Sequence, residues 1–288
     1  MPPMDPKPGD PNPADLTALR AEIDRIDDAL HDLLMRRAEM VEQVAGSAAK
    51  AATSVALRPG REAAIIRRLL ARHEGRLPAQ ALVRLWRELL AATTSMQRPF
   101  AIAVGGADLA GVAREQFGNL TPLRVHASPA QAIATVSGGN ASAAVLPLPT
   151  QDEPAGTAWW TSLLRQDRPR LHVVGRLPFW APRAEGAPTA EALVVAAVTP
   201  DASGEDRGLI AVEMDSGVSH ARLSAALIAA DLAPRSLILR RDPGQGALGL
   251  VEVDGALADD DPRLARIGAL RPPVVLGIYA IPVAGAGS

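Results

Sequence analysis

The chain has 288 residues, a formal net charge of −2 and 48% hydrophobic residues, enough for two or three compact domains with their own cores. This balanced charge argues against a nucleic-acid partner, because neutralising phosphates takes a basic surface. The absence of cysteine excludes disulfides, thiol nucleophiles and cysteine-ligated metals, and the five histidines lack metal-binding spacing. No apolar run reaches the roughly 18–20 residues of a membrane span, so we expect a soluble, cytoplasmic protein that does not bind membranes.

Residues 1–14 are rich in proline and acidic residues, and no basic segment precedes an apolar one, so we expect a disordered leader rather than a signal peptide. A long helix should follow, with Asp15 as its cap, and run to about Ala45. Its apolar residues recur with the seven-residue repeat of a coiled-coil seam. The seam consists of Leu16, Leu19, Ile23, Ile26, Leu30, Leu33, Met40 and Val44. One position in the middle of this seam is Arg37.

Two shorter helices are predicted next. The first spans residues 59–74, between a proline suited to a helix start and a glycine suited to its end. In it, Arg61 lies in line with apolar residues four and eight positions later. The second begins at Pro78 and ends before Pro99, and its row of tryptophan and leucine continues to Thr93 and Gln97. All three predicted helices therefore carry polar groups in line with apolar rows.

Each of these polar residues has a simple explanation on its own, such as an arginine stem that lies along the surface with its charge in water. Together they are harder to explain, because burying unpaired guanidinium groups is very costly. Glu39 and Glu62 are too few to neutralise the arginines of this region. Those arginines are Arg20, Arg37, Arg58 and Arg61. A bound dianion would supply the missing charge, which predicts a pocket for a small, multiply charged acid inside a helical bundle.

Three stretches, "LRAEIDRIDDALHDLLMRRAEMVE", "RPGREAAIIRRLL" and "LVRLWRELLAATTSMQ", resemble the all-α chorismate mutases, which convert chorismate to prephenate. The resemblance covers residues 15–97. It implies a three-helix domain that forms an intertwined homodimer, in which the long first helices pair. It also implies that no cofactor or metal takes part, because the reaction is an intramolecular rearrangement. The protein would hold a near-attack geometry and stabilise negative charge on the ether oxygen.

The resemblance also implies roles for individual residues. Arg37 and Arg61 would grip the two substrate carboxylates, planar groups that suit bidentate guanidinium. Glu62 would accept a hydrogen bond from the substrate hydroxyl, and Gln97 would donate one to the ether oxygen. A substrate carboxylate bound to Arg37 would explain why an arginine occupies a position in the apolar seam.

Further positions complete the family pattern or depart from it. Arg20 falls where each site borrows an arginine from the other subunit, and Thr93 replaces a serine with another hydroxyl. Many relatives have a lysine where this chain has Ala48. The nearest lysine is Lys50, which an unbroken helix would turn by about 200° away from the site, whereas a bulge would restore it. Arg58 replaces an aspartate of many relatives and would either draw in the dianion or cap the surface.

Residues 98–203 alternate short apolar strands with helices, which predicts an α/β domain with a largely parallel sheet. The stretch "SGGNASAAVLPLP" resembles part of the first lobe of prephenate dehydratases. That family's opening glycine motif has become "GGADLAG", its Thr-Arg-Phe catalytic motif is missing, and the segment has about half the expected length. We therefore expect a degenerate lobe without dehydratase activity.

Residues 204–288 follow a βαββαβ order, the ferredoxin-like plan of ACT regulatory domains. The ligand-binding signatures of dehydratase-linked ACT domains are replaced by "GVSHARL" and "PRSLILRR", so amino-acid sensing is not supported. ACT-like modules often pair edge to edge, and an oligomerisation role is at least as well supported.

The predicted protein is thus multidomain, with an all-α mutase domain, an α/β domain and a ferredoxin-like domain. The leading hypothesis is a chorismate mutase of phenylalanine and tyrosine biosynthesis that acts as a homodimer on chorismate, without a cofactor. One alternative is a non-catalytic binding or regulatory protein, for which Ala48 is the best evidence. A bifunctional mutase–dehydratase is disfavoured by the missing motifs. An isochorismate pyruvate-lyase would share the helical fold and much of the arginine set.

Overall fold

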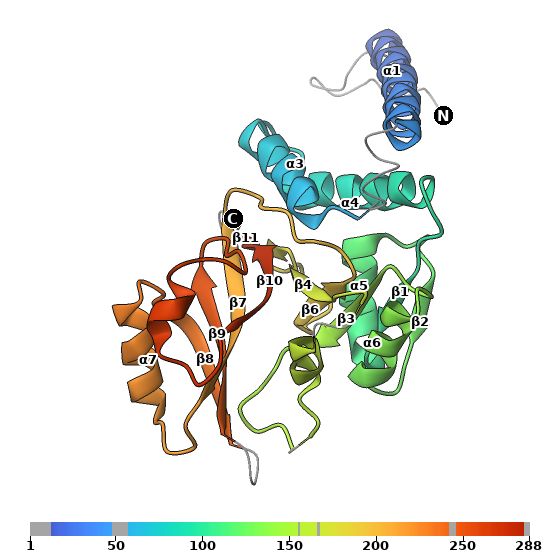
Figure 1. Cartoon of the computed structure of the whole chain (residues 1–288). Coiled ribbons are helices and arrows are strands. Elements are labelled where there is room, and N and C mark those ends of the chain that lie inside the picture. The colour runs from blue at the N-terminus through green and yellow to red at the C-terminus, as the bar shows by residue number, and fades with distance from the viewer. Residues whose placement is uncertain (1–12, 48–56, 155, 166–167, 242–245, 285–288) are drawn as a thin grey trace. The chain divides into compact units, whose positions relative to one another are not determined.

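The computed structural model describes residues 13–47, 57–154, 156–165, 168–241 and 246–284 (Figure 1). The chain forms two compact units, residues 1–54 and 55–288. The first twelve residues of the predicted leader, together with Ala48 and Lys50, lie outside the described residues. Among the described residues, no helix combines the length and the apolarity needed to cross a bilayer.

The first unit contains one long helix, α1 (Pro13–Gly46). It begins two residues before the predicted cap, so Asp15 lies in its first turn, where an acidic side chain interacts favourably with the helix dipole. The predicted seam is exposed along the helix, with exposed fractions of 59% for Leu19 and 62% for Leu33. A continuous apolar stripe of this kind is the feature of a helix that packs against a partner.

The second unit opens with α3 (Pro59–Ala71) and α4 (Ala79–Ser95), two helices that pack against each other. The helix α3 ends before the predicted stop, because residues 72–78 form the connecting turn, in which a His73 ring nitrogen lies 2.6 Å from the Leu77 carbonyl oxygen. Apolar residues of both helices join one cluster with two residues of the sheet region. The cluster consists of Ala63, Ile66, Val83, Leu90, Phe179 and Ala280.

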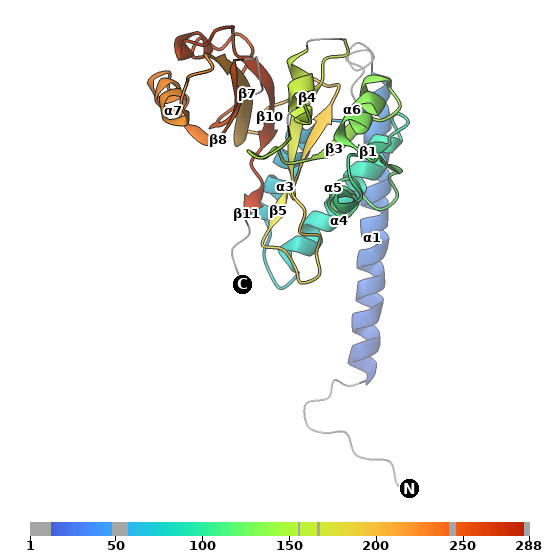
Figure 2. The ribbon, with the colours of Figure 1, turned by 90° about the horizontal axis from the view of Figure 1, so that it is seen from below.

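A nine-stranded sheet forms the rest of this unit, in the order β2-β1-β3-β6-β4-β10-β7-β9-β8 (Figures 1 and 2). Its first half contains β1 (Ile102–Val104), β2 (Leu123–Val125), β3 (Ala143–Pro147), β4 (His172–Leu177) and β6 (Ala192–Ala196), with the α-helices α5 (Ala110–Phe117) and α6 (Pro129–Ser137). Two 3₁₀ helices also belong to this half: η2 (Trp159–Leu164), and η1 (Ala107–Leu109), which precedes α5.

The expectation of a largely parallel sheet is wrong. The strand β1 runs parallel to β2 and β3, but β6 runs antiparallel to both of its neighbours, β3 and β4. The physical reason is the connection over residues 178–191, which turns the chain from β4 directly back along it, as in a hairpin. This half of the chain therefore forms a mixed α/β sheet, and η2 and α6 pack on one face of it while α5 packs on the other.

The second half contains β7 (Asp206–Met214), α7 (His220–Ala229), β8 (Pro234–Arg241), β9 (Ala247–Asp254), the 3₁₀ helix η3 (Leu264–Ile267) and β10 (Val274–Ala280). Its strand order β10-β7-β9-β8 is ferredoxin-like, with η3 in place of the second α-helix. The short strands β5 (Trp180–Ala181) and β11 (Val283–Ala284) pair beside the main sheet. Figure 1 shows α7 against β7–β9, where its leucines pack into a shared core.

The two halves share one sheet, because β10 also pairs in parallel with β4. At the junction Gly277 has φ of +152°, and a Cβ there would lie 2.0 Å from the carbonyl oxygen of Val173. Glycine is therefore required for this close approach of two backbones. Both sequence-based domain boundaries, 97/98 and 203/204, lie inside the second compact unit.

The outer edge of the sheet, at β8, is partly covered by a loop. The side-chain amide of Gln151 bonds to both the N–H and the carbonyl of Leu239, at 3.1 and 2.8 Å. Arg240, which is buried, donates to the carbonyls of Glu153 and Pro154. Such coverage protects an edge strand from pairing with another chain at these positions.

Candidate functional site

Two predicted site residues, Arg20 and Arg37, lie on α1, and we describe them on that helix alone. Arg20 is exposed and Arg37 is half-buried. Seventeen residues separate them, which is about 25 Å along an α-helix at 1.5 Å per residue. One copy of α1 therefore cannot direct both guanidinium groups at the same small ligand.

Arg58, Arg61 and Glu62 lie at the start of α3, within its first turn and a half. Pro59 occupies the first helical position, as predicted, because its fixed φ suits a helix start. Arg58 is exposed and lies 3.4 Å from the carboxylate of Asp201, in the loop after β6. The side chain of Arg61 is mostly in solvent, while its backbone N–H donates to the same carboxylate.

The carboxylate of Glu62 turns inward from α3. Its Oε2 accepts a hydrogen bond of 3.1 Å from Nη1 of Arg87, which is only 4% exposed. The guanidinium of Arg87 stacks 4.5 Å from the centre of the Phe179 ring, a cation–π contact. Burial raises the pKa of Glu62 although the charge of Arg87 acts to lower it, and burial lowers the pKa of Arg87 to about 10 although Glu62 acts to raise it.

Thr93 and Gln97 lie one turn apart near the C-terminal end of α4. This is the position expected from the row of apolar residues in this helix. Thr93 is buried, and its hydroxyl donates to the carbonyl of Leu89 at 2.8 Å. Gln97 is half-buried, and its side-chain amide donates to the carbonyl of Thr93 at 3.1 Å. The second unit thus carries Arg61, Glu62 and Thr93 on two helices that pack together, with Arg58 and Gln97 directly beside their ends.

The eight predicted site residues all fall within one continuous stretch of the chain. Residues 19–98 match the family model of chorismate mutase type II. The resemblance expected for the helical region is thereby confirmed, and this segment is called the mutase region below. It contains every residue discussed above except Asp201 and Phe179, which belong to the α/β region.

Comparison with curated proteins gives a partial relative. The chain is 28% identical over 159 residues to a bifunctional chorismate mutase/prephenate dehydratase of Stutzerimonas stutzeri. That alignment covers 53% of this chain and 44% of the relative. The chain thus spans less than half the length of this curated protein, and the aligned residues extend beyond the length of the mutase region.

Two solved structures superpose on part of this chain. The quorum-quenching acylase GqqA superposes with a TM-score of 0.47 at 18% identity, over 62% of this chain and 94% of that one. A prephenate dehydratase from Arthrobacter aurescens, in complex with L-Phe, superposes with a TM-score of 0.42 at 13% identity, over 62% of this chain and 90% of that one.

Arg87 was missed in the sequence, although the same kind of signal was there to find it. It stands four residues after Val83 and three before Leu90, in the row of α4 that is buried. Arg37 and Arg61 show the same pattern in the sequence, an arginine in line with apolar residues. Its partner, Glu62, was assigned to the substrate instead, so the buried ion pair between the two helices was not anticipated.

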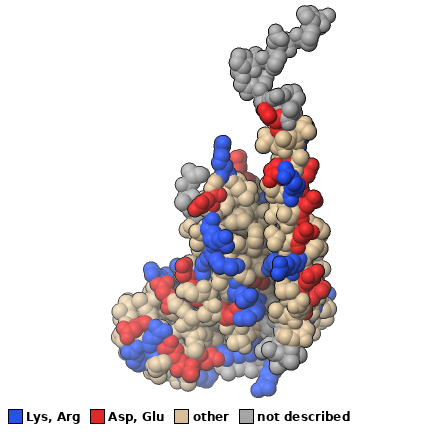
Figure 3. Space-filling model, turned by 90° about the horizontal axis from the view of Figure 1, so that it is seen from above, with Lys and Arg blue, Asp and Glu red and all other residues tan. Residues whose placement is uncertain are grey.

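A small cavity lies beside Arg87, between α4, α5 and the β4–β5 segment, with a volume of about 30 Å³. Arg183 and Glu115 line it, and these two side chains form an ion pair. A space of this volume holds only a few water molecules and is too small for a six-membered ring with two carboxylates. Across the described residues, no group of three histidine, aspartate or glutamate side chains is placed to hold a metal ion. Basic and acidic side chains are interspersed on the face seen in Figure 3.

Proposed function

We propose that the mutase region converts chorismate to prephenate. The observation that carries this proposal is the match of residues 19–98 to chorismate mutase type II, a span that includes all the residues assigned to the substrate. The arginines set among apolar residues give independent support, because they fit a dicarboxylate ligand. The proposed role places the protein in the biosynthesis of aromatic amino acids, in the cytoplasm.

In the proposed mechanism the substrate supplies the reacting bonds and the protein supplies shape and charge. Arg37 and Arg61 hold the two carboxylates, with Arg58 and Arg20 adding positive charge around them. Glu62 accepts the hydrogen bond of the substrate hydroxyl through Oε1, while Arg87 holds Oε2. Gln97 donates to the ether oxygen as its bond to carbon breaks, and the hydroxyl of Thr93 supports that side of the site. Lys50 would add a second donor if the chain brings it back toward the ligand. No cofactor or metal is needed.

The site is proposed to be shared by two copies of the chain. The separation of about 25 Å between Arg20 and Arg37 along α1 means that one pocket needs them from different copies. The exposed seam of α1 offers the surface through which the copies would pair.

Ile26→Asp places a charge in this seam and should convert the dimer to a monomer. Ala21→Asp, on the opposite side of the heptad repeat, should leave the dimer intact. Analytical ultracentrifugation distinguishes them, and a monomeric wild type would overturn this part of the proposal.

A second candidate function follows from the relative, whose name joins chorismate mutase and prephenate dehydratase. We infer that the dehydratase activity is absent here, because "GGADLAG" replaces the family's opening motif and the Thr-Arg-Phe motif is missing. A non-catalytic regulatory role would explain Ala48. These alternatives differ in the products they would give.

The test is to incubate the purified full-length chain with chorismate and to quantify prephenate, phenylpyruvate and pyruvate separately. Prephenate alone is the expected result. Phenylpyruvate in addition would establish a bifunctional enzyme, and pyruvate would indicate lyase chemistry. If chorismate stays unchanged beyond its spontaneous rate, the mutase proposal is wrong and a binding role takes its place.

A further inference from the structure

The N-terminal end of α3 has no local side-chain cap. Residue 58, at the N-cap position, is an arginine, and it makes no side-chain cap hydrogen bond. The N–H groups of the first turn have no partner within the helix and need an acceptor from elsewhere. Serine, threonine, asparagine or aspartate at the N-cap would normally accept them, from the second or third helical residue.

Asp201 supplies that acceptor from the α/β region, 140 residues away in the chain. Its Oδ1 accepts from the N–H of Gly60 at 3.0 Å and its Oδ2 from the N–H of Arg61 at 3.1 Å. These are the second and third residues of the helix, the same two donors that an N-cap side chain would bind. The negative charge also lies at the positive end of the helix dipole, and the Arg58 guanidinium is 3.4 Å away.

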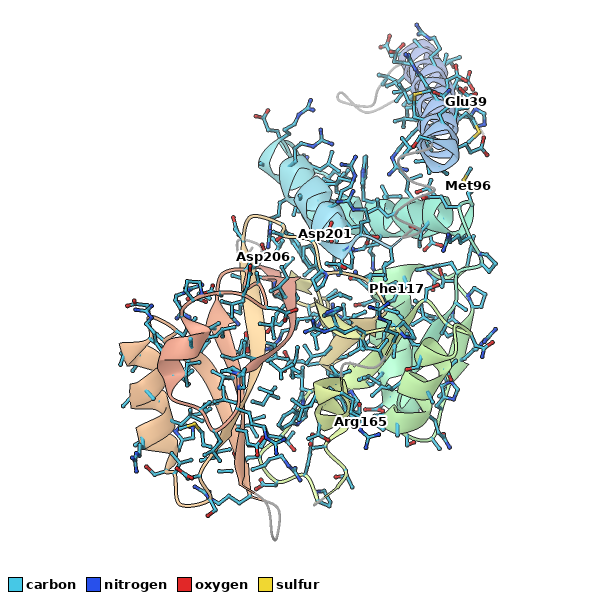
Figure 4. All side chains as sticks on the ribbon, in the orientation of Figure 1. Glu39, Met96, Phe117, Arg165, Asp201 and Asp206 are labelled. Carbon is cyan, nitrogen blue, oxygen red and sulfur yellow. The ribbon has the colours of Figure 1, made fainter. Side chains whose placement is uncertain are left out.

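Two features indicate a defined contact. A Cβ on Gly60 would lie 2.0 Å from the backbone oxygen of Asp201, so only glycine lets the loop approach this closely. The loop itself is held by the buried Asp206, whose carboxylate accepts from the N–H groups of Ser203 and Gly204. Figure 4 labels Asp201 beside the start of α3 and Asp206 at the end of this loop, where β7 begins.

A second contact ties the same loop to the next part of α3. Arg67 donates to the hydroxyl of Ser203 at 2.8 Å, to the carbonyl of Glu205 at 3.0 Å and to the carbonyl of Ile281 at 2.7 Å. The loop thus holds α3 at two points. Only the Asp201 contact lies at the helix start, where Arg61 and Glu62 stand.

We propose that Asp201 is a positioning residue of the mutase site, which caps α3 from outside the mutase region and fixes the first turn that carries Arg61 and Glu62. The α/β region is thereby required for full turnover, although it contributes no group to the chemistry. This inference rests on the proposed function for its effect on turnover, while the cap itself can be tested without substrate.

The experiment compares the full-length wild type with Asp201→Ala, Asp201→Asn and the control Glu205→Gln. Glu205 belongs to the same loop, but its side chain is 72% exposed and lies 3.7 Å from Arg67, so its loss should matter little. Hydrogen exchange of residues 57–66 reports the cap, and kcat and KM for chorismate report its effect. In Asp201→Ala we expect faster exchange in this segment and a kcat lower by roughly ten-fold. Asp201→Asn, which keeps one acceptor, should fall between it and the wild type.

A rescue separates local capping from general loss of stability. In Asp201→Ala, the added change Arg58→Ser places an N-cap hydroxyl where Gly60 and Arg61 need an acceptor. The exchange protection of residues 57–66 and kcat should both recover. KM should rise, because Arg58→Ser also removes the positive charge of Arg58. Unchanged exchange in Asp201→Ala, or faster exchange with an unchanged kcat, would overturn the inference. A wild type that leaves chorismate unchanged overturns the proposed function instead, and the exchange data still decide whether Asp201 caps α3.

Discussion

Glu62 of α3 and Arg87 of α4 form a buried ion pair at 3.1 Å, covered by the ring of Phe179. The pair joins the two helices of the mutase region that pack on the sheet, and the covering ring comes from the α/β region. Glu62, which is proposed to contact the substrate, is therefore held in place by the same contacts that pack the helices against the sheet.

Loss of one partner of this pair should destabilise the protein strongly. Arg87→Met leaves the Glu62 carboxylate buried without its counter-charge, which typically costs about 3–5 kcal/mol. Arg84→Met is the matched control, because Arg84 lies one turn earlier on α4 and is 64% exposed; its effect should stay within about 0.5 kcal/mol. Denaturant unfolding measures both. The double variant Glu62→Gln/Arg87→Met should regain part of the loss. Equal denaturation midpoints for Arg87→Met and Arg84→Met would contradict this account.

Helix positions were predictable from the chain because they depend on local signals. The apolar repeat placed α1, and Pro59 and Pro78 marked the starts of α3 and α4 to within one residue. The failures have non-local causes. The direction of β6 depends on which strand it pairs with after a turn. The N-terminal cap of α3 depends on Asp201, and no pattern in the sequence relates this residue to Gly60.

The candidate site was predictable to a similar extent. An arginine in an apolar row was a sufficient signal for Arg37 and Arg61, and it also marked Arg87. The signal shows that such a charge needs a partner, but it does not say whether the partner is a ligand or another side chain. Only the fold distinguishes them for Arg87, because Glu62 reaches it from a different helix 25 residues earlier.

Acid should weaken the sheet through Glu252, a buried carboxylate on β9. Burial acts to raise its pKa, but hydrogen bonds from Tyr279 and Arg207 and the charges of Arg207 and Arg176 outweigh it and hold the pKa below that of an ordinary glutamate. The folded state thus binds this proton less tightly than the unfolded chain. The stabilisation is therefore complete above the unfolded pKa and is lost as the pH falls through the folded pKa.

The measurement is the free energy of unfolding between pH 3 and 7 for the wild type and Glu252→Gln. We expect a difference of about 1.5–3 kcal/mol at pH 7, the value of hydrogen bonds to a charged group, shrinking toward pH 3. Glu185→Gln, an exposed residue, serves as the control and should follow the wild type throughout. A difference for Glu252→Gln that is the same at every pH would show that packing, not charge, is responsible.

Arg37→Ala should abolish measurable turnover of chorismate while leaving α1 helical. The proposed role is to bind a substrate carboxylate, so kcat/KM should fall at least about 100-fold. Its neighbour Arg36, which is exposed, provides the matched control in Arg36→Ala. Circular dichroism checks that both variants keep their helix content. Wild-type turnover by Arg37→Ala would remove Arg37 from the site.

The position of the missing lysine gives a pair of opposite predictions. If α1 continues as a regular helix to residue 48, Ala48→Lys adds a donor near the ether oxygen and raises kcat, whereas Lys50→Ala has no effect. Losing an active donor of this type typically costs roughly 10²–10³ in rate. A loss of that size in Lys50→Ala would show instead that a bulge brings Lys50 into the site.

The junction of the two sheet halves should be highly sensitive to substitution at Gly277. Gly277→Ala demands φ near +152° from a residue with a side chain, and its Cβ would meet the Val173 oxygen at 2.0 Å. Strain and clash act together, so we expect a loss of more than about 3 kcal/mol. Gly255 has φ of +90° but open space around it, so Gly255→Ala isolates the strain, at about 1–2 kcal/mol. Because the clash separates β10 from β4, Gly277→Ala should also speed hydrogen exchange in both strands, which Gly255→Ala should not do. Equal losses in the two variants would mean that the backbones at this junction can move apart without cost.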